Sequence, residues 1–211
     1  AGYYRMRVSK AGFASIERPF DPVGLSLSPS AGHIDLTLQN RELAPSDMVW
    51  VDAADAGVST TSGLTTPAPV PGFWLDKHEV SNRQFKSFVD AGAYRTRASW
   101  KEPFVEAGRT LRWEDAMSRM LDTTSRAGPA TWQLGTYPDD TDDLPVAGVS
   151  WYEAAAYCDP IQKTLPTAHH WYQAAGAGFF STILQLSNFG GHGPQPVGRN
   201  RGLPQYGALD M

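Results

Sequence analysis

The single thiol of the chain, Cys158, is the first residue to consider for nucleophilic or redox chemistry. One cysteine cannot form an internal disulfide, so its presence says little about the redox compartment. Trp151, Ala154, Ala155 and Cys158 are spaced at i, i+3, i+4 and i+7, as on one apolar stripe of a helix. A thiol on such a stripe is more often buried and inert than nucleophilic, so we expect Cys158 to be structural.

Two polar clusters suggest metal binding. His169 and His170 are adjacent, but neighbouring helical residues point about 100° apart and cannot readily bind one ion together. We expect one of them at the rim of the core and the other at a helix start.

The run 139–143 contains four aspartates, yet it lacks the Gly at position six and the Glu at position twelve of an EF-hand loop. It is interpreted as a solvated acidic turn.

Tryptophans could line a groove for a sugar or a peptide, because the chain has seven of them. Core packing is the competing interpretation, and we favour it for Trp113, Trp151 and Trp171, whose helical stripes are expected to face inward. Trp100 and Trp132 fall in expected loops, where sequence periodicity gives no information on burial. Both interpretations stay open for these two residues.

Composition limits the class of protein. The 211 residues are 41% apolar, enough for a hydrophobic core, and 18 basic against 22 acidic residues give a net charge of -4. Basic residues do not cluster, which argues against nucleic acid as a partner. The apolar stretches are also too short to span a membrane.

Two predicted helices carry several of these candidate residues. Ser150 and Glu153 have the spacing of a capping box, which predicts a helix from Trp151 that stops before Pro160. A second helix is expected over 169–175, opened by Pro166-Thr167.

Two further helices are expected earlier in the chain. Ser81 and Gln84 form another capping-box pair, and that helix should end at Gly92 in a left-handed cap. Apolar residues at helical spacing over 113–121 predict the other helix.

Alternating residues predict strands near the N-terminus. Residues 3–8 and 34–39 alternate with period two, and a turn at 10–13 leads to a strand over 14–20. We therefore predict a small antiparallel β module over residues 1–44. A larger domain is predicted over 45–211, with strands at 48–51 and 73–75 and a loop over 55–71.

Several motifs occur in an order that identifies a family. They are Glu79-Val80-Ser81-Asn82, Pro145-Val146-Ala147-Gly148-Val149-Ser150-Trp151, Tyr157-Cys158, Leu165-Pro166-Thr167, Asn188, Pro196-Val197-Gly198 and Leu209-Asp210-Met211. Together they resemble the sulfatase-modifying-factor family, whose founding member is the formylglycine-generating enzyme. The resemblance implies an irregular α+β fold of the C-type-lectin-like class. Residues 1–44 more weakly resemble PEGA β modules, through the single pattern that ends in Gly12-Phe13.

The resemblance also has implications for metals and for the ends of the chain. Asn188 matches a family residue that supplies a side-chain oxygen to a structural calcium, followed by a backbone carbonyl here from Phe189. The alternative is an asparagine that hydrogen-bonds loop backbone. Copper would require a cysteine pair beyond residue 211, because the family reaction uses two cysteines near the C-terminus. Since Asp210-Met211 ends inside a family motif, we expect a chain truncated at its C-terminus.

Three functions from different classes follow. The leading one is a non-catalytic recognition or sensor domain of a bacterial signalling protein, because the chain resembles a subgroup fused to serine/threonine kinases. Peptide, protein and carbohydrate ligands are all compatible with it, and an extracytoplasmic position in a membrane-anchored parent is expected, with a cytoplasmic one as the alternative. The second function is a fragment of a formylglycine-generating-type oxidase or related metal-dependent enzyme, and the third is a structural interaction module.

Overall fold

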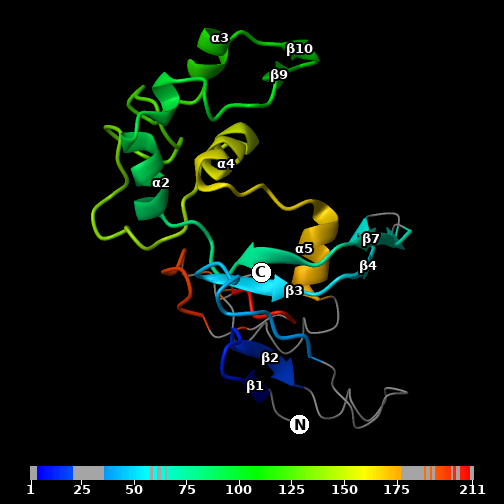
Figure 1. The fold of residues 1–211 in the computed structure, drawn as a ribbon. Helices are drawn as coiled ribbons and strands as arrows, with labels where there is room; N and C mark the ends of the chain where they lie inside the picture. The colour runs from blue at the N-terminus through cyan, green and yellow to red at the C-terminus, as the bar shows by residue number, and fades with distance from the viewer. Residues whose placement is uncertain are drawn as a thin grey trace. The chain divides into compact units, whose positions relative to one another are not determined.

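A computed structural model of the chain describes most of its residues, namely 4–20, 36–57, 59–60, 63–64, 66–176, 188, 191, 193–200, 202 and 205–209. They belong to two compact units. The first comprises Ala1–Glu79, Pro166–Gly193 and Gly198–Met211, and the second comprises Val80–Leu165 and Pro194–Val197. Both helices and antiparallel strands are present (Figure 1), in agreement with the expected α+β class. The boundary expected between residues 44 and 45 stays a prediction.

The strands of the first unit pair as antiparallel hairpins. The pairs are β1 (Tyr4–Val8) with β2 (Ile16–Phe20), β3 (Met48–Val51) with β8 (Phe73–Asp76), β4 (Ala54–Ala56) with β7 (Ala68–Val70), and β5 (Ser59–Thr60) with β6 (Gly63–Leu64). The last three pairs are nested in one another. The strands predicted at 3–8, 14–20, 48–51 and 73–75 are thereby confirmed in their described parts. The loop predicted over 55–71 is wrong, because much of that segment forms the outer pairs of this hairpin.

The strand predicted over 34–39 is not found in its described part. Residues 36–39 have no strand structure, and residues 34 and 35 lie outside the described residues. The segment meets the rest of the chain at an isolated bridge between Phe13 and Asn40, where Ala14 N donates to Gln39 O at 2.9 Å. Alternation of apolar residues alone therefore overstated the extent of pairing.

Helix α5 (Ala168–Ala175) covers the core of the first unit. Thr167 and His170 form its capping box, and Ala174 packs in a cluster with Val51 and Tyr206. Strand β2 is tied to the same region, because buried Arg18 donates to Tyr206 O at 2.7 Å. The N-terminal hairpin thus shares hydrogen bonds with residues far along the chain.

Helices α2 (Asn82–Asp90) and α4 (Trp151–Cys158) form the centre of the second unit. The ring of Tyr157 stacks on Phe85 at 5.4 Å between centroids and meets Phe88 edge-on at 5.7 Å. The other elements of this unit are the short helices η1 (Ala93–Arg95), α3 (Trp113–Met117) and η2 (Asp159–Ile161), and strands β9 (Val105–Glu106) and β10 (Arg109–Thr110). The capped helix starts at Ser81 and Ser150 are confirmed, and Gly92 adopts the predicted left-handed conformation.

Helix α3 is shorter than the predicted helix over 113–121. Arg112 precedes it and provides no side-chain cap, so the helix start lacks a hydrogen bond that Ser or Asp would supply. At the other end Ser118 Oγ donates to Asp115 O at 2.8 Å, a local bond that competes with continuing the helix. Met120 O then accepts from Gly128 N at 3.3 Å, outside any helix.

The apolar stripe predicted on α4 is wrong. The buried residues of this helix are Glu153 and Ala156, whereas Trp151 is 57% exposed and Cys158 is only half-buried. The physical reason is a hydrogen bond from Tyr94 Oη to Glu153 Oε1 at 2.6 Å, which turns the acidic residue of the capping box inward. The helix is therefore rotated away from the face that hydrophobicity alone selects.

Loss of the Ser150 cap should cost a measurable part of the stability. Ser150 Oγ accepts from Glu153 N at 3.3 Å, so Ser150→Ala is expected to lower the free energy of unfolding by about 1 kcal/mol. Urea unfolding measures the change. Ser87→Ala, on the exposed side of α2, is the matched control and should leave the midpoint almost unchanged; an equal midpoint for both variants would refute the role of the cap.

Candidate functional site

The second unit contains a pocket of about 280 Å³, which we call the aromatic groove. Its walls come from the segment after η1, from α4, from the start of η2 and from the residues that follow η2. The lining residues are Ser99, Trp100, Lys101, Glu102, Phe104, Trp151, Tyr152, Ala155, Ala156, Asp159, Lys163, Thr164 and Leu165. A concave, mostly apolar site with a few polar groups is the usual form of a binding pocket.

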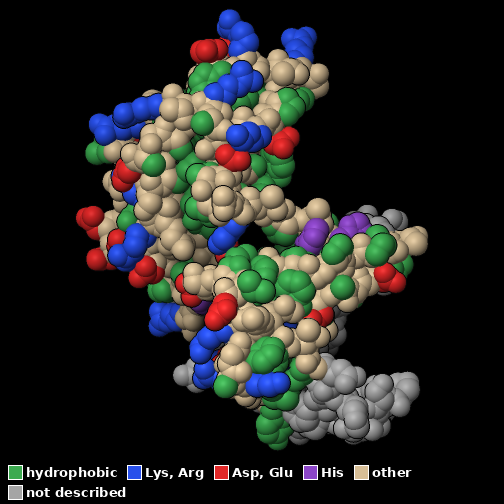
Figure 2. Space-filling model, viewed as in Figure 1, with side chains coloured by type: hydrophobic (Ala, Val, Ile, Leu, Met, Phe, Trp, Pro, Cys, Tyr) green, Lys and Arg blue, Asp and Glu red, His purple; other side chains and the backbone are tan. Residues whose placement is uncertain are grey.

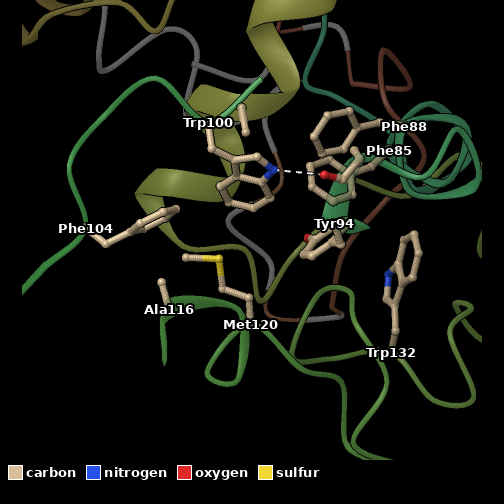
Figure 3. Packing of buried hydrophobic residues seen from close by; sticks show 10 residues of the cluster. Phe85, Phe88, Tyr94, Trp100, Phe104, Ala116, Met120 and Trp132 are labelled. Carbon is tan, nitrogen blue, oxygen red and sulfur yellow. Dashed lines mark hydrogen bonds between the residues drawn. The ribbon is translucent and has the colours of Figure 1, made fainter. Parts of the chain in front are cut away.

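The floor of the aromatic groove is a packed aromatic cluster. Trp100 and Phe104 are 5% and 4% exposed, and their ring centroids lie 5.8 Å apart. Trp100 Nε1 donates to Ala93 O at 2.9 Å, as the dashed line in Figure 3 shows. Tyr152 Oη accepts from Val105 N at 2.8 Å. The polar atoms of these aromatic side chains are therefore engaged within the protein.

The rim of the aromatic groove is more polar and more accessible. Trp151 stands at the first position of α4 with more than half of its surface exposed, and its ring meets Tyr152 edge-on at 5.4 Å. Lys101 Nζ lies 3.7 Å from Asp159 Oδ2. A cation and an anion thus stand close together beside an exposed indole ring.

A buried carboxylate fixes the start of α4 and hence the position of Trp151. Glu153 is 3% exposed, and its two oxygens accept from Tyr94 Oη and from Ser150 N, each at 2.6 Å. Burial raises the pKa of Tyr94 well above its ordinary value, and the neighbouring Glu153 carboxylate raises it further. Tyr94 therefore stays a hydrogen-bond donor at every physiological pH.

Asp122 organises a loop that sequence reasoning overlooked. Its carboxylate is buried and accepts from Thr124 N, Thr124 Oγ1, Arg126 N and Gly135 N at 2.7–2.9 Å. Burial alone would raise the pKa of Asp122, but the backbone donors of Arg126 and Gly135 and the two groups of Thr124 lower it to about 2. The available signal was an aspartate followed by two threonines, which favours a side-chain-to-backbone turn.

The tryptophans divide into buried and exposed ones. Trp100 and Trp132, which the sequence left open, are buried in the core shown in Figure 3. Trp113 packs against that core, as predicted. The inward orientation predicted for Trp151 and Trp171 is wrong, because they are 57% and 40% exposed. Each stands on a helix whose buried face is made of smaller or polar side chains.

The histidine pair takes part in local structure. His170 Nδ1 lies 2.6 Å from Thr167 Oγ1 in the capping box of α5, and its ring meets Phe73 edge-on at 4.6 Å. His169 is half-buried. In the described part of the chain, no three His, Cys, Asp or Glu side chains gather as metal ligands would.

The acidic run is largely solvated. Asp139 and Asp140 are exposed, and Arg83 reaches Asp142 at 3.8 Å and Asp143 at 3.2 Å. These are exposed ion pairs of small energetic value. The solvated acidic turn is confirmed.

Asn188 makes a contact within its loop. The residue is exposed, and its Nδ2 donates to Gly193 O at 2.9 Å. This bond is of the kind expected for the alternative in which Asn188 organises loop backbone. Phe189 lies outside the described residues, so calcium at Asn188 and Phe189 stays a prediction.

Charges on the second unit are mixed in sign. Lys and Arg side chains around α3 and β9–β10 stand beside Asp and Glu side chains on the face shown in Figure 2. Arg112 pairs with Asp115 at 3.0 Å, and Arg119 pairs with Glu106. As far as the chain is described, its helices are all too short or too polar to cross a membrane.

Comparison with known proteins places the chain in a family. The Sulfatase-modifying factor enzyme 1-like domain matches residues 35–205, so the chain belongs to this family, whose fold is C-type-lectin-like. It is 30% identical over 131 residues to the formylglycine-generating enzyme of Bos taurus, covering 56% of this chain and 34% of the relative. The chain thus spans about a third of the length of the first of these relatives.

Two other relatives carry different names. The inactive C-alpha-formylglycine-generating enzyme 2 of Bos taurus is 31% identical over 141 residues, covering 60% of this chain and 45% of the relative. The serine/threonine-protein kinase Pkn1 of Chlamydia trachomatis serovar L2 is 26% identical over 150 residues, covering 67% of this chain and 22% of the relative. The family therefore includes proteins named as enzymes, as an inactive form and as a kinase.

Proposed function

We propose that this chain is a non-catalytic recognition domain of a larger bacterial signalling protein linked to a serine/threonine kinase. The observation that carries the proposal is the aromatic groove, with a packed aromatic floor and the exposed indole of Trp151 at its rim. An exposed aromatic side chain beside a concave apolar surface is typical of a binding hot spot. The Pkn1 relative supports the kinase linkage, and the relative named as inactive supports a role without catalysis.

The residues that could do chemistry support the same proposal. Cys158 is the only cysteine in the sequence, and it lies half-buried at the end of α4. A reactive cysteine needs an accessible thiolate in an electropositive environment. A half-buried thiol is less accessible than such a residue requires, which favours a structural role for Cys158.

An oxidase of the formylglycine-generating type is the second candidate, favoured by the 30% identity to the Bos taurus enzyme. Its cysteine pair and any copper would have to come from outside these residues. We further propose three features of the recognition domain. They are a calcium ion at Asn188 and Phe189, a PEGA-like β module over residues 1–44, and an extracytoplasmic location.

The kinase linkage has a direct test. Sequencing the whole reading frame around this chain should reveal a kinase domain, and its purified product should transfer phosphate from ATP to serine or threonine. Incubation with a non-hydrolysable ATP analogue is the control and should leave the protein unphosphorylated. A reading frame without a kinase domain, or a product that transfers no phosphate, would contradict the linkage.

A further inference from the structure

We infer that the aromatic groove binds a bulky apolar side chain from an extended peptide segment of a protein partner, rather than a sugar. The inference rests on the proposed recognition role and adds the chemical class of the ligand. It depends on three properties of the groove, which are the engaged polar atoms of its floor, its size and the mixed charge of its rim.

The floor offers little to a hydroxylated ligand. Trp100 Nε1 already donates a hydrogen bond to Ala93 O, and Tyr152 Oη already accepts one from Val105 N. The remaining side chains of the floor, such as Phe104, are apolar. A sugar would bury hydroxyl groups there without partners, at a large cost in free energy, whereas an apolar side chain would bury none.

The size of the groove suits one large side chain. An apolar cavity of about 150 Å³ is known to hold a benzene ring. At about 280 Å³, the aromatic groove can hold a phenyl or isobutyl group and part of the adjoining backbone. Trp151 can then close over that side chain from the rim, because more than half of its surface is exposed.

The rim offers one donor and one acceptor side chain to the two polar groups of a peptide bond. Lys101 Nζ and Asp159 Oδ2 stand 3.7 Å apart, so one can donate to a carbonyl oxygen and the other can accept from an amide N–H. Glu102 and Lys163 add one further charge of each sign to the lining. The four charges cancel, which suits a neutral peptide backbone better than a polyanion or a polycation.

Fluorine NMR tests the ligand class directly. The product of the whole reading frame is labelled with fluorotryptophan, and the Trp151 signal is identified by its loss in Trp151→Phe. The probes are the capped peptide Ac-Gly-Ser-Phe-Ser-Gly-NH2, the same peptide with Ser in place of Phe, and the trisaccharide chitotriose. We expect the Phe peptide to shift the Trp151 signal with a Kd at least roughly tenfold lower than that of either other probe, because only its phenyl group fills the groove.

Matched variants complete the test. Trp151→Ala should weaken binding of the Phe peptide by at least roughly tenfold, whereas Trp171→Ala, which removes an exposed tryptophan outside the groove, should leave its Kd unchanged. Chitotriose binding as tightly as the Phe peptide would overturn the inference, as would a Trp151 signal that no probe shifts. The kinase assay does not depend on the groove, so either result can be separated from failure of the kinase linkage.

Discussion

Replacing Trp132 by alanine is expected to lower the free energy of unfolding by about 4 kcal/mol, because it removes the largest fully buried side chain of the described residues. Trp132 is 1% exposed and meets Phe85 and Tyr137 edge-on. Its Nε1 donates to Asn82 Oδ1 at 3.1 Å, so the substitution also leaves a buried amide oxygen with one donor fewer.

Urea unfolding followed by circular dichroism measures this effect. The control is Trp171→Ala, which removes the same side chain from a position that is 40% exposed and should cost less than about 1.5 kcal/mol. Equal losses for the two variants would show that Trp132 is not in the core.

Replacing Asp122 by alanine is expected to cost about 3 kcal/mol, because four donors lose a charged acceptor at once. The loop that Asp122 organises leads into Trp132, whose backbone oxygen accepts from Thr123 N at 3.1 Å. Loss of the hydrogen bonds to Asp122 should therefore also disturb the packing of Trp132 in the core. Asp139→Ala, at an exposed position, is the control and should leave the free energy of unfolding almost unchanged.

The effect of Asp122 should depend on pH in a defined direction. Folding lowers the pKa of Asp122 from its ordinary value of 3.8 to about 2. A lowered pKa contributes stability that is fully present above pH 3.8 and is lost as the pH falls through about 2. The stability difference between the wild type and Asp122→Asn should therefore shrink over that range, and a difference that stays constant down to pH 2 would contradict this role of the carboxylate.

Helix starts could be predicted from sequence because their signals are local. The pairs Ser81 with Gln84 and Ser150 with Glu153 each carry the complete capping geometry within four residues. The capping box at Thr167 was missed, because a histidine at its third helical position is outside the usual pattern. The family was also recognisable, because its motifs are short and keep their order.

The orientation of α4 could not be predicted, because it depends on a residue far away in sequence. Tyr94 lies 59 positions before Glu153, and their hydrogen bond sets which face of the helix is buried. Burial of Trp100 and Trp132 was equally hidden, since irregular segments have no periodicity that distinguishes a core residue from a surface one. The aromatic groove depends on the orientation of α4 and on the burial of Trp100, so it became visible only in the structure.

Mass spectrometry of a cysteine-containing sulfatase peptide tests the central claim, a recognition role without catalysis, most directly. The peptide is incubated with the product of the whole reading frame, copper and oxygen. We expect no conversion of cysteine to the aldehyde, because we propose a role without catalysis and because Cys158, the single cysteine among these 211 residues, is half-buried at the end of a helix. Detectable aldehyde would contradict the account, and its disappearance in Cys158→Ser would assign the chemistry to this domain.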